Sequence, residues 1–141
     1  MGDGYPTKCY ATGEVTSKWS AGGIISYIHS YQQDVSYCFG LNTKITKETG
    51  TSTNFGRIAG NNFGAPNNNY ALGTMQYFSS PTATGTTTFV NAQTTQNGKD
   101  GITITEAQAK QQSTYVNAGW DFTSVWKMPS SGGYPILKWQ E

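Results

Sequence analysis

The chain has 141 residues, of which 12% are charged and 13% are aromatic, and its formal net charge is +1. This near-neutral balance excludes the basic surface that is typical of proteins binding nucleic acid or an anionic membrane. A disordered chain would carry more net charge and fewer aromatic residues, so we expect a single folded domain built from short strands and turns.

A short motif recurs along the first half of the chain. It reads CYATGEV from Cys9, CFGLNTKI from Cys38 and NYALGTM from Asn69, at intervals of 29 and 31 residues. A second motif alternates with it, because AGGIIS from Ala21 matches FGRIAG from Phe55. Self-similarity at a period of about 20 to 50 residues indicates stacked supersecondary units.

Strands rather than helices are predicted to form these units. Gly, Thr and Asn are dense across residues 11–98, and all three are unfavourable in helix interiors. At about 3.3 Å per residue, a period near 30 residues accommodates three short strands and their turns, which make one coil of a β-solenoid. We therefore predict an all-β fold, a right-handed β-solenoid (β-helix) fragment of about three coils over residues 1–104, with a cap over residues 105–141 of the same domain.

Stacked coils place like residues above one another, so the repeats define ladders of side chains. The predicted ladders are Cys9, Cys38 and Asn69, then Tyr10, Phe39 and Tyr70, then Ile24 and Ile58 in an inward position. Alternation puts the cysteine and aromatic ladders on opposite faces of their strand, and the sequence leaves open which of them points inward. We expect the thiols to stack unbonded as small buried side chains, with a disulfide between coils as the alternative.

The composition changes after the repeats. One further strand is predicted near residues 86–90, followed by a turn at residues 97–101. TEAQAKQQ, residues 105–112, favours a helix, and Thr105 with Gln108 has capping-box spacing. SSGG between aromatic-rich stretches then predicts a hairpin. We expect this short helix and aromatic hairpin to cover the end of the solenoid with large buried side chains: Trp120, Phe122, Trp126, Tyr134 and Trp139.

These motifs resemble a known family. CYATGEV followed by AGGIIS is similar to the GLUG-motif repeat, which joins an Asn-Cys-Tyr-Ala-Thr-Gly stretch to a Gly-Gly-apolar-apolar-Gly stretch. The tail AGWDFTSVWKMPSSGGYPILKW resembles the ending that follows such repeats in many secreted bacterial proteins. The second and third repeats depart from the motif, with Phe39-Gly40-Leu41 in place of Tyr-Ala-Thr and Asn69 in place of Cys. The resemblance covers residues 7–78 and 105–140.

The resemblance implies a β-helical module of secreted or cell-surface bacterial proteins, as found in adhesin-like chains and beside surface peptidase domains. It brings no established catalytic residues. We therefore expect an extracellular, non-catalytic structural or adhesive module whose partner is a host or matrix protein or a glycan. The alternatives are a carbohydrate-binding module that uses exposed aromatic side chains and an accessory domain of an exported peptidase. We also expect a fragment of a longer chain, because the first repeat starts close to Met1.

Residues suited to catalysis are few. His29 is the single histidine, which excludes a metal site built from several histidines. A cysteine nucleophile would need Cys9 or Cys38 beside His29, with an orienting group such as Asp34. No two carboxylates occupy equivalent positions in adjacent repeats, as a glycosidase would require, and NGKDG at residues 97–101 lacks the ligand spacing of a calcium loop. We expect no metal, no cofactor and, since no apolar run approaches about 20 residues, no membrane span.

The candidates for ligand contact are aromatic. An N-terminal group of rings can stack on sugars or on protein surfaces: Tyr5, Trp19, Tyr27, Tyr31 and Tyr37. The competing interpretation is that several of these rings pack between coils.

Overall fold

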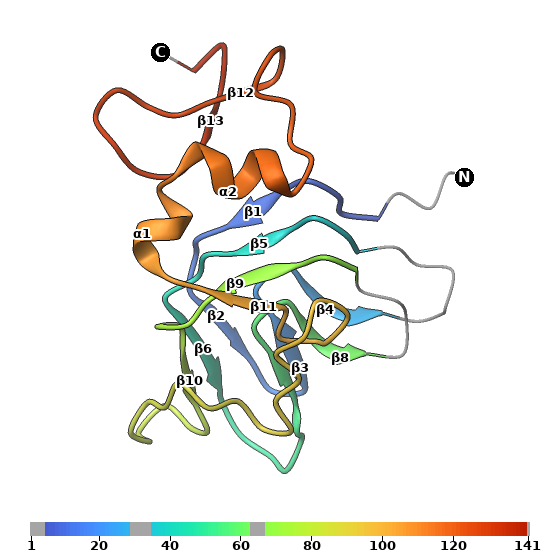
Figure 1. Cartoon of the computed structure of the whole chain (residues 1–141). Helices are drawn as coiled ribbons and strands as arrows, with labels where there is room; N and C mark the ends of the chain where they lie inside the picture. Colours follow the sequence, from blue (N-terminus) through green and yellow to red (C-terminus); the bar gives the residue numbers. More distant parts are fainter. Residues whose placement is uncertain (1–4, 29–34, 63–66, 141) are drawn as a thin grey trace.

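The structure is a computed structural model that describes residues 5–28, 35–62 and 67–140. Figure 1 shows short strands stacked side by side, with the helices and the C-terminal hairpin at one end of the stack. His29, Tyr31 and Asp34 lie outside the described residues, so the predictions made for them are not addressed by this structure.

Gly, Ser and Asn interrupt every apolar run in the repeats, which keeps the strands short. The first repeat forms β1 (Tyr10–Ala11), β2 (Val15–Ser17), β3 (Ser20–Gly22) and β4 (Ile25–Ile28). The second forms β5 (Phe39–Gly40), β6 (Lys44–Lys47), β7 (Asn54–Gly56) and β8 (Ala59–Asn62). The third contributes β9 (Tyr70–Leu72) and β10 (Gln76–Phe78), and β11 (Ile102–Ile104) follows after a long connection.

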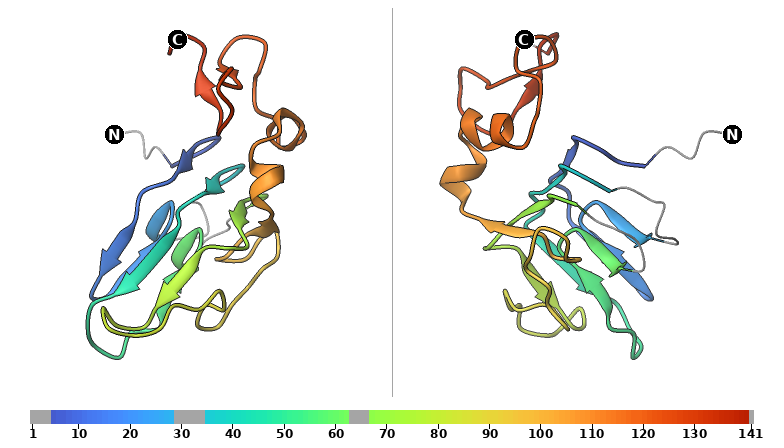
Figure 2. Two further views of the ribbon diagram at one scale, coloured as in Figure 1. Left: turned by 90° about the vertical axis from the view of Figure 1, so that its left-hand side faces the viewer. Right: turned by 45° about the vertical axis from the view of Figure 1, so that its right-hand side comes forward.

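Parallel pairing joins the strands of the first repeat to their counterparts in the second, and β5 and β6 to β9 and β10 of the third (Figure 2). The strand orders are β1-β5-β9-β11, β10-β6-β2, β3-β7 and β4-β8. Tyr10 pairs with Phe39, and Phe39 pairs with Tyr70, so these three aromatic residues share one register position. The Phe39 and Tyr70 rings are stacked, with centroids 4.8 Å apart.

The second motif also stacks on itself. Gly22 pairs with Gly56, and the Ile24 N–H donates to the Ile58 carbonyl at 3.0 Å. Gly56 must lack a side chain, because a Cβ there would overlap the Ala59 carbonyl oxygen across the tight turn between β7 and β8. Ile58 is fully buried and Ile24 is partly buried, because the first repeat stands at the edge of its sheets.

Short helices follow β11. The predicted capping box starts α1 (Glu106–Ala109): Thr105 Oγ1 accepts from the Gln108 N–H at 3.1 Å, and Gln108 Oε1 accepts from the Thr105 N–H at 2.8 Å. The next helix, α2 (Gln112–Asn117), buries Tyr115. Both helices therefore present their buried side to the strands.

The C-terminal hairpin is antiparallel and consists of β12 (Trp126–Lys127) and β13 (Ile136–Leu137). The Tyr134 hydroxyl donates to Glu106 Oε1 at 2.9 Å, which ties the hairpin to α1. Burial, followed by the contact with the Glu106 carboxylate, raises the pKa of Tyr134 to about 12.

The helices and the hairpin cover the aromatic ladder. The Phe39 ring lies 4.5 Å from Tyr115 and 5.4 Å from Trp120, measured between ring centroids. Trp120 is buried, and its Nε1–H donates to the Tyr37 carbonyl at 2.8 Å. Partly buried Phe122, Trp126 and Tyr134 pack against the same core.

The expected burial of Trp139 is wrong. Its side chain is 78% exposed. Trp120 and Trp126, with ring centroids 4.5 Å apart, already cover the ladder. The chain turns after β13, where the Gln140 N–H donates to the Leu137 carbonyl at 2.9 Å, and this turn leaves Trp139 outside the core.

The predicted fold, an all-β, right-handed solenoid fragment of about three coils, is also wrong. The described part of the chain is a small, mostly-β domain with parallel sheets of two to four strands, an antiparallel hairpin and helices. The strand expected near residues 86–90 is absent from this described segment, where Thr86 makes only an isolated antiparallel bridge to Tyr77. Ser, Thr, Gly and Asn dominate residues 79–101 and favour turns, so the third repeat does not supply partners for β7 and β8.

Candidate functional site

The cysteine ladder lies inside the domain. Cys9 Sγ and Cys38 Sγ are 3.5 Å apart, and both thiols are free. Asn69 continues the ladder, because its Oδ1 accepts from the Cys38 N–H at 2.9 Å and its Nδ2 donates to the Val35 carbonyl at 2.7 Å. Cys38 and Phe39 are both buried. The sequence left open whether the cysteine ladder or the aromatic ladder points inward. In the structure both faces of β5 are covered, so both ladders are buried at this strand.

The two thiols differ in reactivity. The hydrogen bond to Cys38 lowers the pKa of Cys9, whereas the same contact and burial raise the pKa of Cys38. Because Cys9 is also only partly buried, we expect iodoacetamide to alkylate Cys9 in the native protein and Cys38 only after unfolding. Peptide mass spectrometry measures the order of labelling. Faster labelling of Cys38, or no free thiol in unreduced, unfolded protein, would contradict this prediction.

The aromatic residues proposed for ligand contact do not form one surface. Trp19 is 76% exposed, whereas Tyr5, Tyr27 and Tyr37 are partly buried. Tyr37 lies two residues before β5 and its carbonyl accepts from Trp120 of the C-terminal cover, while Trp19 lies in the connection between β2 and β3, strands that Figure 1 shows away from that cover. The structure therefore separates Trp19 from Tyr37.

The connection that carries Trp19 is held by hydrogen bonds. The Trp19 carbonyl accepts from the Ser52 hydroxyl, and its N–H donates to Ser17 Oγ at 3.3 Å. The next residue, Ser20, pairs with Asn54 of the second repeat. The exposed indole thus projects from backbone that is anchored to the neighbouring layer.

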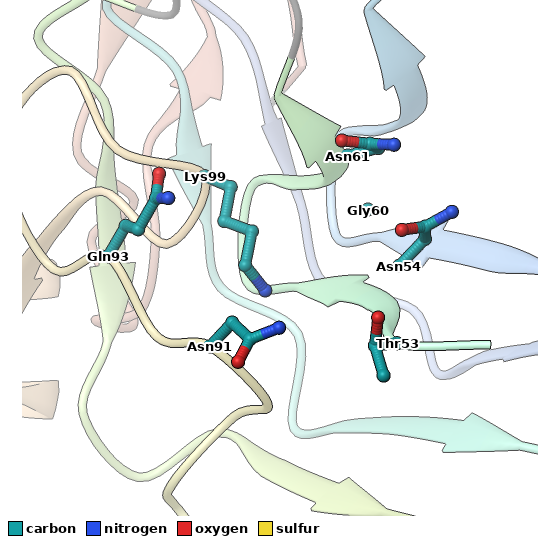
Figure 3. Close-up of a pocket in the computed structure, with 7 residues that line it drawn as sticks. All are labelled: Thr53, Asn54, Gly60, Asn61, Asn91, Gln93 and Lys99. Atoms are coloured by element: carbon teal, nitrogen blue, oxygen red, sulfur yellow. The ribbon is translucent and has the colours of Figure 1, made fainter. Parts of the chain in front are cut away.

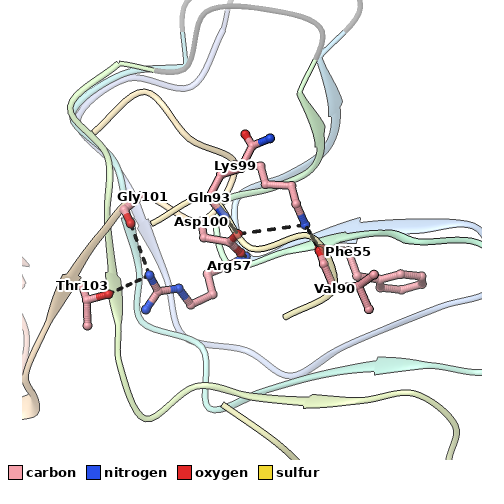
Figure 4. Close-up of polar contacts among 8 residues, drawn as sticks. All are labelled: Phe55, Arg57, Val90, Gln93, Lys99, Asp100, Gly101 and Thr103. Carbon is pink, nitrogen blue, oxygen red and sulfur yellow. Dashed lines mark hydrogen bonds and ion pairs between the residues drawn. The ribbon is translucent and has the colours of Figure 1, made fainter. Parts of the chain in front are cut away.

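A cluster of buried charges joins the long connection between β10 and β11 to the turn between β7 and β8 (Figure 4). Arg57, Lys99 and Asp100 are 4%, 6% and 0% exposed. Asp100 Oδ1 accepts from the Arg57 N–H at 2.9 Å, and Oδ2 accepts from the Gln93 N–H at 2.7 Å. One carboxylate therefore joins the second repeat to the connection.

The Lys99 ammonium bonds to neutral acceptors. It donates to the Phe55 carbonyl and, at 2.7 Å, to the Val90 carbonyl. Asp100 Oδ2 lies 4.0 Å away, beyond hydrogen-bond distance. Burial lowers the pKa of Lys99, and the charge of Asp100 opposes that shift.

The Arg57 guanidinium is also held by neutral acceptors. It donates to the carbonyls of Leu72 and Gly101, each at 3.2 Å, and to Thr103 Oγ1 at 2.9 Å. Burial lowers its pKa, again opposed by Asp100. With two cations and one carboxylate, the cluster carries one excess positive charge.

The backbone of Lys99 takes the place of a missing strand. The N–H groups of Ile24 and Ile25 donate to the Ile58 carbonyl at 3.0 and 3.1 Å. One layer further on, the N–H groups of Ile58 and Ala59 both donate to the Lys99 carbonyl at 3.0 Å. Lys99 therefore occupies the position in the third layer that Ile58 holds in the second.

A polar hollow of about 150 Å³ opens beside this cluster (Figure 3). Its walls come from β7, β8 and their flanks on one side, and from the long connection on the other. The strand side supplies Thr53, Asn54, Gly60 and Asn61. The connection supplies Asn91, Gln93 and Lys99. Among these described lining residues, Lys99 is the one with a charge.

A smaller hollow of about 120 Å³ lies on the Arg57 side of the cluster. Phe89, Gly73 and Ala92 line part of it, together with threonines and Asp100. Because the Asp100 carboxylate is part of its lining, an anion is less suited to this hollow than to the first.

Within residues 5–28, 35–62 and 67–140, no group of three or more His, Cys, Asp or Glu side chains is arranged to hold a metal ion. In the same residues, no helix has the length and apolar character needed to cross a membrane.

Comparisons with protein-family models, curated proteins and solved structures find no match for this chain. The resemblance to the GLUG-motif repeat therefore rests on the sequence motifs alone.

The sequence pattern did not single out Arg57, Lys99 or Asp100. Residues 97–101 were predicted to form a plain turn, and the structure does place a turn there, with the Gly101 N–H donating to the Gly98 carbonyl. A signal was present, since Arg57 stands where the first repeat has Gly23. An arginine at a position that holds glycine in the first repeat indicates that the second repeat is not followed by a third copy of the same strands.

Proposed function

We propose that this chain is a non-catalytic structural and adhesive module of a secreted or cell-surface bacterial protein. The observation that carries the proposal is the exposed Trp19 indole on a hydrogen-bonded connection of the stacked strands. An exposed indole on anchored backbone offers a large contact area at little cost in conformational entropy, and tryptophan is enriched at the centres of binding surfaces.

The bonding of the buried charges supports a non-catalytic role. Asp100 accepts two backbone N–H groups, while Lys99 and Arg57 donate to backbone carbonyls of the second repeat, the third repeat and the connection. Groups used in this way stabilise backbone that lacks a strand partner, and none of them is poised as a general acid or base.

A carbohydrate-binding module is the second candidate. It is favoured by the exposed Trp19 ring and, separately, by the amide side chains that line the polar hollow, such as Asn54 and Asn91. An exposed aromatic ring can stack on the face of a sugar, and amide side chains can hydrogen-bond its hydroxyls.

Arrays of matrix proteins and glycans test both candidates with one variant. We expect Trp19→Ala to weaken binding to the captured partner about tenfold or more, as loss of a central indole does. Trp139→Ala is the matched control, because Trp139 is equally exposed (78%) but belongs to the C-terminal hairpin segment. Equal binding by both variants, or turnover of an arrayed substrate, would contradict the proposal.

A further inference from the structure

We infer that the hollow between β7, β8 and the connection at residues 91–99 is a binding subsite for a small carboxylate, either free or as the acid group of a sugar. This inference does not require the proposed adhesion through Trp19. It rests on the charge of the buried cluster, on the strand edges that the third repeat leaves open, and on the size of the hollow.

Charge sets the sign of the ligand. Two buried cations, Arg57 and Lys99, share one carboxylate, Asp100, so one positive charge in the cluster is not balanced. Uncompensated buried charge is unfavourable, and an anion placed beside Lys99 would offset it. No acidic residue is among the described residues that line the hollow.

Donors and shape set the class of anion. An ammonium has three N–H donors, and the carbonyls of Phe55 and Val90 take two of those on Lys99. Figure 3 shows the Lys99 side chain extending into the hollow, with its nitrogen on the side of Asn91. Amide groups of Asn54 and Asn91 on the walls suit the oxygens of a carboxylate or of neighbouring hydroxyls.

Size limits the ligand. A volume of about 150 Å³ is that of a cavity that holds benzene, a ligand of about six heavy atoms. A carboxylate with a few further atoms fits within this volume, whereas a complete sugar ring would extend past the rim. The acid group of a uronic sugar could therefore enter while its ring remains outside.

The open strand edges explain why a hollow exists here. β7 and β8 pair with β3 and β4 on one side only among the described strands. The Lys99 carbonyl replaces the missing strand at Ile58, in the turn between β7 and β8, and at Ala59, the first residue of β8. Beyond these two residues, β7 and β8 have no described strand beside them on this edge. Their polar side chains face the connection across the hollow.

Titration of ¹⁵N-labelled protein with D-glucuronate, acetate and D-glucose tests the inference. We expect glucuronate and acetate to shift the amide signals of Lys99, Asn91 and Asn54, and glucose to bind at least about tenfold more weakly than glucuronate, because it lacks the charge. Acetate binding as tightly as glucuronate would identify a site for free carboxylates. Clearly tighter glucuronate would identify an acidic sugar. Equal binding of glucose and glucuronate, or no shifts at about 50 mM of either acid, would overturn the inference.

Variants test the same charge. Asn91 is exposed with φ of +52°, a conformation that Asp also adopts, so Asn91→Asp should fold normally and weaken glucuronate about fivefold or more. Gln96→Glu, an exposed change of equal charge outside the lining, is the control and should stay within about twofold. Equal effects of the two variants would overturn the inference.

Lys99→Gln keeps amide donors for the carbonyls of Phe55 and Val90 but removes the charge, so it should abolish binding of glucuronate. If that variant fails to fold, the Asn91→Asp comparison remains decisive.

Discussion

Asp100→Ala is expected to destabilise the domain by about 3–5 kcal/mol, the usual cost of removing one partner from a buried ion cluster. The substitution leaves the N–H groups of Arg57 and Gln93 without their acceptor, and it leaves two buried cations without a counterion. Since a small domain is stable by only about 5–15 kcal/mol, the urea midpoint should fall markedly. Urea unfolding followed by circular dichroism measures the change.

Glu14→Gln is the control for Asp100→Ala. The Glu14 side chain is 62% exposed and pairs with Lys44 at 3.2 Å, so its removal should cost less than about 1 kcal/mol. Asp100→Asn should fall between the two, because one oxygen still accepts a hydrogen bond while the charge is lost. If Asp100→Ala is no worse than Glu14→Gln, the connection between β10 and β11 is not held by this carboxylate.

Trp120→Ala is expected to destabilise the domain by about 3–5 kcal/mol, in the range typical of a buried large aromatic residue. The indole is 3% exposed, packs on Phe39 and Trp126, and donates to the Tyr37 carbonyl. Its removal would leave a cavity between the aromatic ladder and the C-terminal segment, and an unsatisfied carbonyl within it. Thermal unfolding followed by near-ultraviolet circular dichroism reports both packing and stability.

Trp139→Ala provides the matched comparison for Trp120→Ala. The two substitutions remove the same atoms from the same C-terminal segment, but Trp139 is 78% exposed. Its loss should change stability by no more than about 0.5 kcal/mol. A large effect at Trp139 together with a small one at Trp120 would mean that the segment packs on the strands differently from this structure.

The pairing of the repeats could be predicted from the sequence because each strand pairs in register with the same positions of the next repeat. Like side chains recur at like positions, so aligning CYATGEV with CFGLNTKI and NYALGTM predicts the pairing of Tyr10 with Phe39 and of Phe39 with Tyr70. The capping box at Thr105 was readable for a similar reason, since it depends on two side chains and the backbone within four residues. Local and periodic features are encoded over short distances.

The end of the repeat was decided by the tertiary structure. The solenoid prediction assumed that the third repeat continues as the first two do, but residues 79–101 form turns, and Lys99 and Asp100 replace the missing strand through contacts with Phe55 and Arg57. Those partners are 43 and 44 residues away, too far for any local pattern to connect them. The burial of Trp120 and the exposure of Trp139 were also decided by the tertiary structure. The sequence shows that the C-terminal segment is rich in aromatic residues, but the space available for packing determines which of the rings are buried.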